Sequence, residues 1–395
     1  MERMTEKIEE KIALLHASKT KVCLVAAGAG AGCQNLISKV PGASATLLAC
    51  FFPYSREALT DFIGFEPERS ASEETSLRMA ARAWRIGAEI ATKQGEDPSC
   101  VIGLGVTAVI ATNRPLKGDH RVYISVRARE GFLVSQIVFA KKEDGLSFLG
   151  RTHEGELCDI LSLNMILHSA GIEQVSLPNI ALTGDLIRTD RGIIISPRKI
   201  ERNVEISSEG HTFIEADGVR TGLKFLDSEK HILFWGSFNP FHFGHERIAK
   251  EAEARVGKKV VYGITNNHPV KGKVCREEIL ARINQFQYLA PVLVANDIQL
   301  YVEKVKAFRG FTFIIGADVL EMILDVRYYR IPVREVLREF SKHGTRFFVA
   351  NRHCGNEFVS FNELRKNIPV RFRGMFEQLS SVIDISSTKI RRFTA

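Results

Sequence analysis

The sequence has no long apolar run, no tandem repeat and no low-complexity segment. Its apolar runs are far shorter than the roughly 18 residues that suggest a membrane-spanning helix. The opening stretch, MERMTEKIEEKIALLHASKTKV, is charged and lacks the apolar core of a signal peptide. It is also rich in glutamate, which argues against a mitochondrial transit peptide. We therefore expect a globular protein with no membrane partner.

Paired-cysteine spacing is also missing. The seven cysteines are scattered, odd in number and without a CxxC pair. This pattern suits reduced thiols in the cytoplasm or the nucleus better than a disulfide framework or a zinc site. The cysteines are Cys23, Cys33, Cys50, Cys100, Cys158, Cys275 and Cys354.

Acidic residues are in deficit, so the formal net charge is +8 and the isoelectric point lies near 9.1. Such an excess favours anionic partners. The basic residues form no dense run and accompany no known nucleic-acid-binding module, so nucleotide phosphates explain the charge and we predict no nucleic-acid partner.

Residues 1–172 carry the pattern of one α/β domain. Apolar runs alternate with helical periodicity, and the first run ends in the glycine-rich stretch GAGAG. Residues 173–229 have a different texture, with short strand-like runs between glycines and charges. The sequence leaves open whether they form a connecting subdomain or extend either neighbour. The strands expected in residues 1–172 are Lys21–Ala27, Ala45–Phe52, Cys100–Thr112 and Arg121–Arg127, and the helices are 5–17, Cys33–Val40, Glu74–Ala91 and Leu157–Ala170.

Residues 230–395 alternate strands with helices, which predicts a Rossmann-like, doubly wound and mostly parallel sheet. The fold class we expect is therefore α/β with two domains. The expected strands are Ile232–Trp235, Lys259–Ile264, Val292–Ala295, Thr312–Gly316 and Arg346–Ala350, and the helices are Gly244–Val256, Arg276–Leu289 and a last one from about Ser387.

The stretch HILFWGSFNPFHFGHERIAK, residues 231–250, has the features of a phosphate site. An apolar strand breaks at Gly236 and Ser237, a polar turn carries His242 and His245, and a helical pattern follows. Open α/β sheets bind ligands at the carboxyl ends of their strands. Two imidazoles at a helix start can face one anion beside the positive end of the helix dipole.

These residues are similar to the HxGH signature of the nucleotidylyltransferase superfamily. Two further segments, ISSTKIR at Ile385–Arg391 and FIIGAD at Phe313–Asp318, resemble motifs of the nicotinamide and nicotinate mononucleotide adenylyltransferases. Together with Asn267–Lys271, they span nearly the whole second half. Cytidylyltransferases and pantetheine-phosphate adenylyltransferases share the HxGH signature and remain alternatives.

The resemblance implies transfer of an adenylyl group from ATP to a pyridine mononucleotide, with pyrophosphate leaving. The attacking phosphate is already an anion, so catalysis requires positioning and charge neutralisation and no general base. Mg²⁺ is expected to arrive on ATP, without a metal site on the protein. The catalytic residues that the resemblance implies are His242, His245 and Arg391, and the nucleotide-binding residues are Gly236, Ser237, Phe238, Asn239, Lys271, Gly316, Asp318, Ser386, Ser387 and Thr388.

Several of these residues also have an ordinary structural interpretation. Ser386–Thr388 suits a helix N-cap, Asp318 suits a helix start, and Lys271 suits an exposed loop. Bacterial members of the family commonly present a tryptophan after the FIIGAD segment. Here Tyr328 or Tyr329 is the candidate to stack on the pyridine ring.

The first half resembles the CinA carboxy-terminal domain, a family of nicotinamide mononucleotide amidohydrolases, through PGAS at Pro41–Ser44 and YSREA at Tyr54–Ala58. Aligned on these anchors, the family's nucleophilic serine falls on Ala27 and its activating lysine on Leu59. Neither side chain supports amide hydrolysis, so we expect a catalytically inactive domain that serves as an oligomerising scaffold. The glycines of GAGAG suit a tight turn better than an anion-binding nest.

The sequence thus predicts a mononucleotide adenylyltransferase whose partners are ATP and a mononucleotide. A hypothesis of another class is a pyridine-nucleotide-binding regulator without turnover. The intact HxGH and ISSTKIR motifs favour the enzyme.

Overall fold

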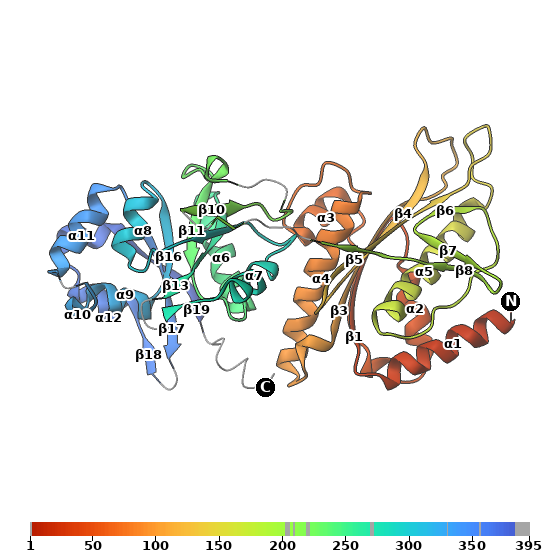
Figure 1. Cartoon of the computed structure of the whole chain (residues 1–395), viewed down its shortest axis with the longest axis horizontal. Helices are drawn as coiled ribbons and strands as arrows, with labels where there is room; N and C mark the ends of the chain where they lie inside the picture. Colours follow the sequence, from red (N-terminus) through yellow and green to blue (C-terminus); the bar gives the residue numbers. More distant parts are fainter. Residues whose placement is uncertain are drawn as a thin grey trace. The chain divides into compact units, whose positions relative to one another are not determined.

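The computed structural model describes residues 2–201, 206–207, 210–218, 222–268, 272–329, 331–354 and 357–383. The chain divides into two compact units, Met1–Arg202 and Asn203–Ala395 (Figure 1). Each unit builds its own sheet, covers it with helices and has its own hydrophobic core, which confirms the predicted α/β class. None of the helices in the described ranges is long and apolar enough to cross a membrane.

The first unit contains a mixed sheet in which β1 pairs in parallel with both β2 and β3, and the later strands pair antiparallel. In sheet order the strands are β2 (Leu47–Phe51), β1 (Lys21–Ala27), β3 (Val101–Val109), β4 (His120–Ala128), β5 (Gly131–Phe139) and β6 (Leu182–Gly184), with β9 (Arg198–Ile200) also on β5 and a separate hairpin of β7 (Leu186–Thr189) and β8 (Gly192–Ile195). The helices are α1 (Glu2–Ala17), α2 (Gly32–Lys39), α3 (Arg56–Ile63), α4 (Glu73–Lys93) and α5 (Gly150–Ser169), with short 3-10 turns η1 (Ala43–Ala45) and η2 (Pro98–Cys100).

Helix α4 lies directly against strand β3, and glycines make this approach possible. A Cβ atom on Gly103 would lie 2.2 Å from the backbone nitrogen of Trp84, and one on Gly105 would lie 2.3 Å from the carbonyl oxygen of Ser76. Helices α1, α2 and α5 contribute Ile12, Ile37 and other apolar residues to the larger core of this unit. The close α4 contact therefore depends on residues that have no side chain.

The segment 173–229, whose affiliation the sequence leaves open, is divided between the two units. Strands β6 and β9 pair antiparallel with β5, and Leu177 and Ile193 are buried in the first core. Strand β10 (His211–Ile214) instead pairs antiparallel with β15 of the second sheet. The partner strands are distant in the chain, so local periodicity contains no information about this division.

The second unit contains a mostly parallel sheet in the order β10-β15-β12-β11-β16-β17-β18, with β19 beside β17. The chain runs from β11 to β12 and β15 on one side and places β16 and β17 on the other, so the direction of winding changes at β11. The strands are β11 (His231–Trp235), β12 (Lys259–Thr265), β13 (Asn267–His268), β14 (Gly272–Lys273), β15 (Val292–Ala295), β16 (Thr312–Gly316), β17 (Arg346–Cys354), β18 (Glu357–Val359) and β19 (Phe376–Ile383).

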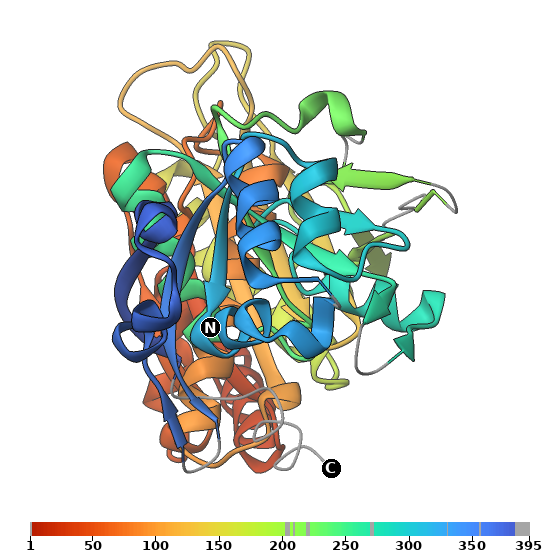
Figure 2. The ribbon, with the colours of Figure 1, turned by 90° about the vertical axis from the view of Figure 1, so that its left-hand side faces the viewer.

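Helices cover both faces of this sheet. Helices α8 and α11, drawn in shades of blue, cover the face that points towards the viewer in Figure 2. Residues of α6 and α7, among them Ile248 and Ile283, bury the opposite face. The helices are α6 (Phe243–Val256), α7 (Arg276–Asn284), α8 (Tyr301–Ala307), α9 (Ala317–Leu324), α10 (Val326–Tyr329), α11 (Val333–Lys342) and α12 (Phe361–Asn367), with 3-10 turns η3 (Leu223–Phe225) and η4 (Val370–Met375). The helix expected from about Ser387 lies outside the described residues.

Candidate functional site

The candidate site begins where the chain leaves the carboxyl end of β11. The turn that follows contains a cis peptide bond between Asn239 and Pro240 and is held by helix α7. The Asn239 amide donates to Glu278 Oε1 (3.0 Å), and the Gln285 amide donates to the Phe238 carbonyl (2.9 Å). The Phe241 N–H donates in return to Gln285 Oε1 (2.8 Å). These contacts fix the path of the chain into α6.

His242 and His245 form one unit at the start of α6. His242 is the N-cap, and its backbone N–H donates to Nδ1 of His245 (3.3 Å), while the two rings stack with centroids 3.7 Å apart. A ring nitrogen that accepts carries no proton, so neutral His245 carries its proton on Nε2. His242 is only 3% exposed, and His245 is half-buried. A Cβ on Gly244 would lie 3.1 Å from Nδ1 of the His242 ring, so a larger residue here would require the ring to shift by a few tenths of an ångström.

Phe238, which the resemblance implies as a nucleotide contact, is a core residue in the structure. Its side chain is 1% exposed, with the backbone in the left-handed region (φ 43°). The ring packs edge-on against His245 (5.1 Å), and Phe241 stacks on the same imidazole (5.8 Å). A large apolar ring is driven into the core by burial of its surface. The buried Phe238 ring therefore helps to fix the position of the His245 imidazole.

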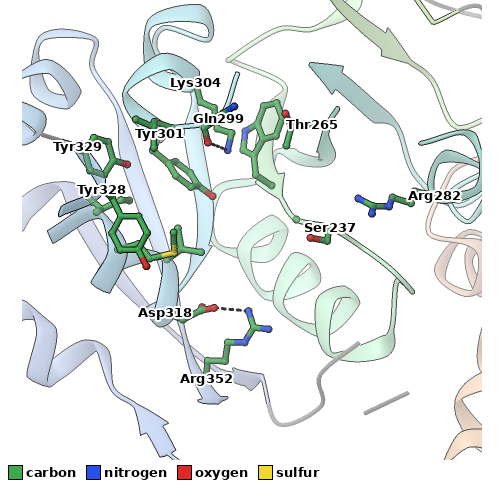
Figure 3. A pocket seen from close by; sticks show the side chains of 16 residues that line it. Ser237, Thr265, Arg282, Gln299, Tyr301, Lys304, Asp318, Tyr328, Tyr329 and Arg352 are labelled. Atoms are coloured by element: carbon green, nitrogen blue, oxygen red, sulfur yellow. Dashed lines mark hydrogen bonds and ion pairs between the residues drawn. The ribbon is translucent and has the colours of Figure 1, made fainter. Parts of the chain in front are cut away.

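A cavity of about 320 Å³ adjoins the start of this turn (Figure 3). Of the predicted residues, Gly236, Ser237 and Asp318 line it, and so do both tyrosine candidates, Tyr328 and Tyr329. His242 and His245 are not among its lining residues. The full lining is Trp235, Gly236, Ser237, Thr265, Arg282, Gln299, Leu300, Tyr301, Lys304, Asp318, Val319, Met322, Ile323, Tyr328, Tyr329 and Arg352.

Sequence reasoning missed several lining residues. Thr265 ends strand β12 and was findable, because parallel strands present ligand groups at their carboxyl ends. Tyr301 and Lys304 lie three residues apart on the short helix α8, so they share a face. Nothing in the sequence indicated that this face would meet the end of β11. Arg282 and Arg352 likewise reach the cavity only through tertiary packing.

Charged groups lie at two separate parts of the cavity wall. Arg352 Nη1 donates to Asp318 Oδ2 (2.9 Å), whereas Asp318 Oδ1 is buried with no partner among the described residues. Arg282 is 8% exposed and donates to Glu278 (2.6 Å), and its buried Nε also has no partner within the described part of the chain. Figure 3 shows Arg282 pointing towards Ser237. The guanidinium of Arg282, beside a glycine-containing turn, suits an anionic ligand.

Burial shifts the pKa values of the titratable side chains at the aromatic end of the cavity. It raises the pKa of both Tyr301 and Tyr329, so these phenols stay neutral at physiological pH. It also lowers the pKa of Lys304 to about 8, while neighbouring Glu303 acts in the opposite direction. At pH 7 Lys304 is therefore still mostly an ammonium ion.

The expected second group of phosphate ligands, Ser386, Ser387, Thr388 and Arg391, lies outside the described residues, as does Lys271. The strand that precedes the ISSTKIR segment is described and packs on α6. Arg247 donates to the Val382 carbonyl (2.9 Å). The carboxylate of Glu251 accepts the N–H groups of Ser380 (2.6 Å) and Ser381 (2.8 Å). Helix α6, which starts at the histidine pair, thus anchors the end of β19.

Glu251→Gln tests this anchor. Burial acts to raise the pKa of Glu251, but hydrogen bonds from Ser380 and Ser381 lower it on balance to about 2, from 4.5 in an unfolded chain. The charged carboxylate therefore stabilises the fold above pH 4.5, and this contribution is lost as the pH falls towards 2. We expect the variant to lose about 1–2 kcal/mol of unfolding free energy at pH 7, because charge-assisted hydrogen bonds become neutral ones.

Urea unfolding of the two proteins at pH 7 and pH 3 measures this effect, and the difference should shrink at the lower pH. Glu377→Gln is the matched control, since Glu377 also meets α6 through Arg255 but is 62% exposed. Equal losses for the two variants would show that Glu251 does not anchor β19.

In the first unit the glycine-rich stretch forms a tight turn. Gly28 and Gly30 have φ near +87° and +89°, and a Cβ on Gly28 would lie 2.4 Å from the Ala108 carbonyl oxygen. The N–H groups of Gly32 and Cys33 at the start of α2 donate to the carboxylate of Asp159. The protein's own carboxylate therefore takes the place that an anion would need.

The positions that correspond to the amidohydrolase nucleophile and lysine are apolar and buried. Ala27 is 6% exposed and Leu59 is 1% exposed, and both belong to the same hydrophobic cluster. Among the residues that the structure describes, no group of three or more histidine, cysteine, aspartate or glutamate side chains is placed to hold a metal ion.

The second unit is similar to a known protein family, and parts of the chain are similar to two known proteins. Residues 233–393 match the family described as cytidylyltransferase-like. The chain is 32% identical over 84 residues to a phosphopantetheine adenylyltransferase of Pyrococcus abyssi, covering 21% of this chain and 53% of that protein, so it spans about half of that relative's length. It is 28% identical over 169 residues to a "Probable nicotinate-nucleotide adenylyltransferase" of Endomicrobium trichonymphae, covering 40% of this chain and 83% of that protein. The second unit thus contains a nucleotidyltransferase-like domain, distantly homologous to both enzymes.

Part of the chain is also similar to solved structures. The competence/damage inducible protein CihA from Agrobacterium tumefaciens is similar over 42% of this chain and 94% of its own, with 18% identity and a TM-score of 0.33. A CinA superfamily protein from Enterobacter cloacae is similar over 42% of this chain and 92% of its own, with 14% identity and a TM-score of 0.32.

Proposed function

We propose that the nucleotidyltransferase-like domain transfers the adenylyl group of ATP to nicotinate or nicotinamide mononucleotide and releases pyrophosphate. The observation that carries the proposal is the cavity that begins at Gly236 and Ser237, beside the histidine-bearing turn, and continues between the rings of Trp235, Tyr301 and Tyr328. A flat pyridine ring suits an aromatic slot of this size. Arg282, which lines the cavity near Ser237, suits the mononucleotide's phosphate.

The proposed reaction is an in-line displacement. An oxygen of the mononucleotide's 5′-phosphate attacks the α-phosphorus of ATP and forms the new P–O bond. The bond from the α-phosphorus to the bridging oxygen breaks, and pyrophosphate leaves with the electron pair. No proton has to be removed from the nucleophile, so the protein's work is positioning and electrostatic stabilisation.

His245 is the proposed donor to the phosphate oxygens on which charge develops. Its Nδ1 accepts from the His242 backbone, so the neutral ring carries its proton on Nε2, and this N–H is the group proposed to donate to the phosphate. The stacked His242 and the rings of Phe238 and Phe241 hold the imidazole in place. A donor held in this way needs little reorganisation as charge develops, which is the basis of electrostatic catalysis.

The remaining phosphate contacts follow from the resemblance. Ser386, Ser387, Thr388 and Arg391 are proposed to hold the β- and γ-phosphates, with Lys271 as a further cation. Mg²⁺ enters bound to ATP and neutralises part of its charge. Arg282 is an addition that the sequence did not suggest, and it is proposed to bind the acceptor's phosphate beside Ser237.

A donor and acceptor screen tests the proposal. ATP and CTP are each incubated with nicotinate mononucleotide, nicotinamide mononucleotide and phosphopantetheine, and pyrophosphate release is followed. We expect the fastest release with ATP and a pyridine mononucleotide. Release only with phosphopantetheine, or only with CTP, would assign one of the related activities instead. Mononucleotide binding without release would identify a regulator.

A further inference from the structure

Lys304 is a buried cation in the wall of the cavity. Its side chain is 5% exposed, and its amine lies 5.0 Å from the ring centroid of Trp235 and 4.5 Å from that of Tyr301. It donates to the Gln299 carbonyl (3.1 Å), as Figure 3 shows. An ammonium group has three N–H donors, so one neutral acceptor and two ring faces leave it incompletely paired.

Within the described ranges the Lys304 amine donates to a backbone carbonyl and pairs with no carboxylate at ion-pair distance. The nearest acidic residue in the chain, Glu303, uses its carboxylate to accept the N–H groups of Gln299 (2.7 Å) and Leu300 (2.8 Å) at the start of α8. Asp318, on the wall formed by α9, is paired with Arg352. A buried charge without a counter-ion is unfavourable in a fold unless a ligand supplies the partner.

The shape of the cavity indicates which part of a ligand meets this cation. A mononucleotide with its phosphate beside Ser237 and Arg282 directs its base into the aromatic part of the cavity, where Lys304 lies. The two pyridine mononucleotides differ only in the group on the ring: nicotinate carries a carboxylate, and nicotinamide carries a neutral amide. Only the carboxylate supplies the missing negative charge.

We propose that Lys304 determines the acceptor of this domain by pairing with a carboxylate on the pyridine base, so that nicotinate mononucleotide is preferred to nicotinamide mononucleotide. This inference rests on the proposed function. It adds a specificity-determining residue and a charge requirement for the base. A neutral amide can accept a hydrogen bond from the ammonium ion through its carbonyl oxygen, but it supplies no counter-charge, and discrimination follows from that difference.

Lys304→Met tests the proposal in the full-length chain. Methionine keeps an unbranched apolar stem and removes the charge. The measurement is kcat/KM for both mononucleotides with saturating ATP at pH 7. We expect the kcat/KM of the parent protein to be about 10- to 100-fold higher for nicotinate mononucleotide than for nicotinamide mononucleotide, the range for a hydrogen bond between charged groups. The variant should lose this preference because its kcat/KM for nicotinate mononucleotide falls, while its kcat/KM for nicotinamide mononucleotide stays the same.

Lys306→Met is the matched control, because Lys306 lies on the same helix but is exposed, and it should keep the parent's preference. Lys304→Arg keeps the charge and should retain part of the preference. If Lys304→Met lowers kcat/KM equally for both mononucleotides, or if the parent protein has the same kcat/KM for both, the inference is overturned while the adenylyltransferase proposal stands. Absence of turnover with either mononucleotide in the parent overturns the proposed function, and the inference falls with it.

The pH dependence of the parent protein gives a second readout that needs no variant. The ammonium form of Lys304 predominates below pH 8 and is lost as the pH rises through about 8. Glu303 acts to retain the proton, and burial raises the pKa of Tyr301 and Tyr329, so both phenols stay neutral near this pH. The other charged groups on the facing wall, Asp318 and Arg352, are paired with each other. The selectivity ratio should therefore fall above pH 8 in the parent and stay flat in Lys304→Met. A flat ratio in both proteins would contradict the proposal.

Discussion

Replacing His245 with alanine is expected to lower kcat by about 10²- to 10³-fold, the usual cost of removing one preorganised donor to a developing oxyanion. The dissociation constant for ATP should change little, because most contacts to the ground-state nucleotide remain. The physical basis is the fixed orientation of the ring, whose Nδ1 accepts from the His242 backbone at 3.3 Å. Pre-steady-state rates of adenylyl transfer and equilibrium binding of ATP separate the two effects.

His153→Ala is the control for this variant. His153 is an exposed histidine of the first unit whose ring contacts only the Leu149 carbonyl among the interactions of the described chain, so its removal should leave kcat unchanged. A His245→Ala protein that loses ATP affinity and rate in equal measure would show a ground-state binding role. Unchanged kcat would remove His245 from the mechanism.

Replacing Gly103 with alanine is expected to destabilise the first unit by about 3 kcal/mol or more, since insertion into a well-packed site typically costs 1–3 kcal/mol and here the obstacle is backbone. The new Cβ would lie 2.2 Å from the Trp84 nitrogen and 2.4 Å from the Ala80 carbonyl oxygen. Helix α4 must move as a whole to make room, and with it the packing over β1, β3 and β4 is disturbed.

The two tryptophans make this prediction measurable, because Trp84 lies in the first unit and Trp235 in the second. In a Trp235→Phe background, urea unfolding followed by fluorescence reports on the first unit alone. Gly155→Ala is the matched control, since nothing lies within 4 Å of its added Cβ in helix α5, and there alanine should be neutral or stabilising by up to about 1 kcal/mol. Equal unfolding midpoints for the two variants would contradict the packing described for α4.

The local part of the second unit follows directly from its sequence. The apolar run predicted as a strand at Ile232–Trp235 is β11, and the periodic stretch predicted as a helix at Gly244–Val256 is α6, each one residue longer at its start. These two elements are determined by short-range patterns of apolar residues, which can be read directly from the sequence. The expected helix Arg276–Leu289 is shorter in the structure and ends at Asn284, and the side chain of the next residue, Gln285, bonds to the Phe238–Phe241 loop.

The wall of the cavity could not be derived in the same way. Helix α8 is too short to give a clear periodic signal, and its residues Tyr301 and Lys304 reach the end of β11 only through packing of distant segments. The burial of the Phe238 ring likewise depends on packing against distant residues such as Phe286, and its predicted contact with the nucleotide stays a prediction. No pattern in the sequence indicated a role for Lys304.

The most direct test of the proposed activity follows the fate of the α-phosphate. ATP labelled at the α-phosphate is incubated with the full-length protein, Mg²⁺ and nicotinate mononucleotide, and the products are separated. We expect the label to appear in a dinucleotide, in amounts equal to the pyrophosphate released, and formation of the dinucleotide to stop when the mononucleotide is omitted. Label that remains in ATP or appears only in AMP, with either pyridine mononucleotide, would contradict the proposed activity.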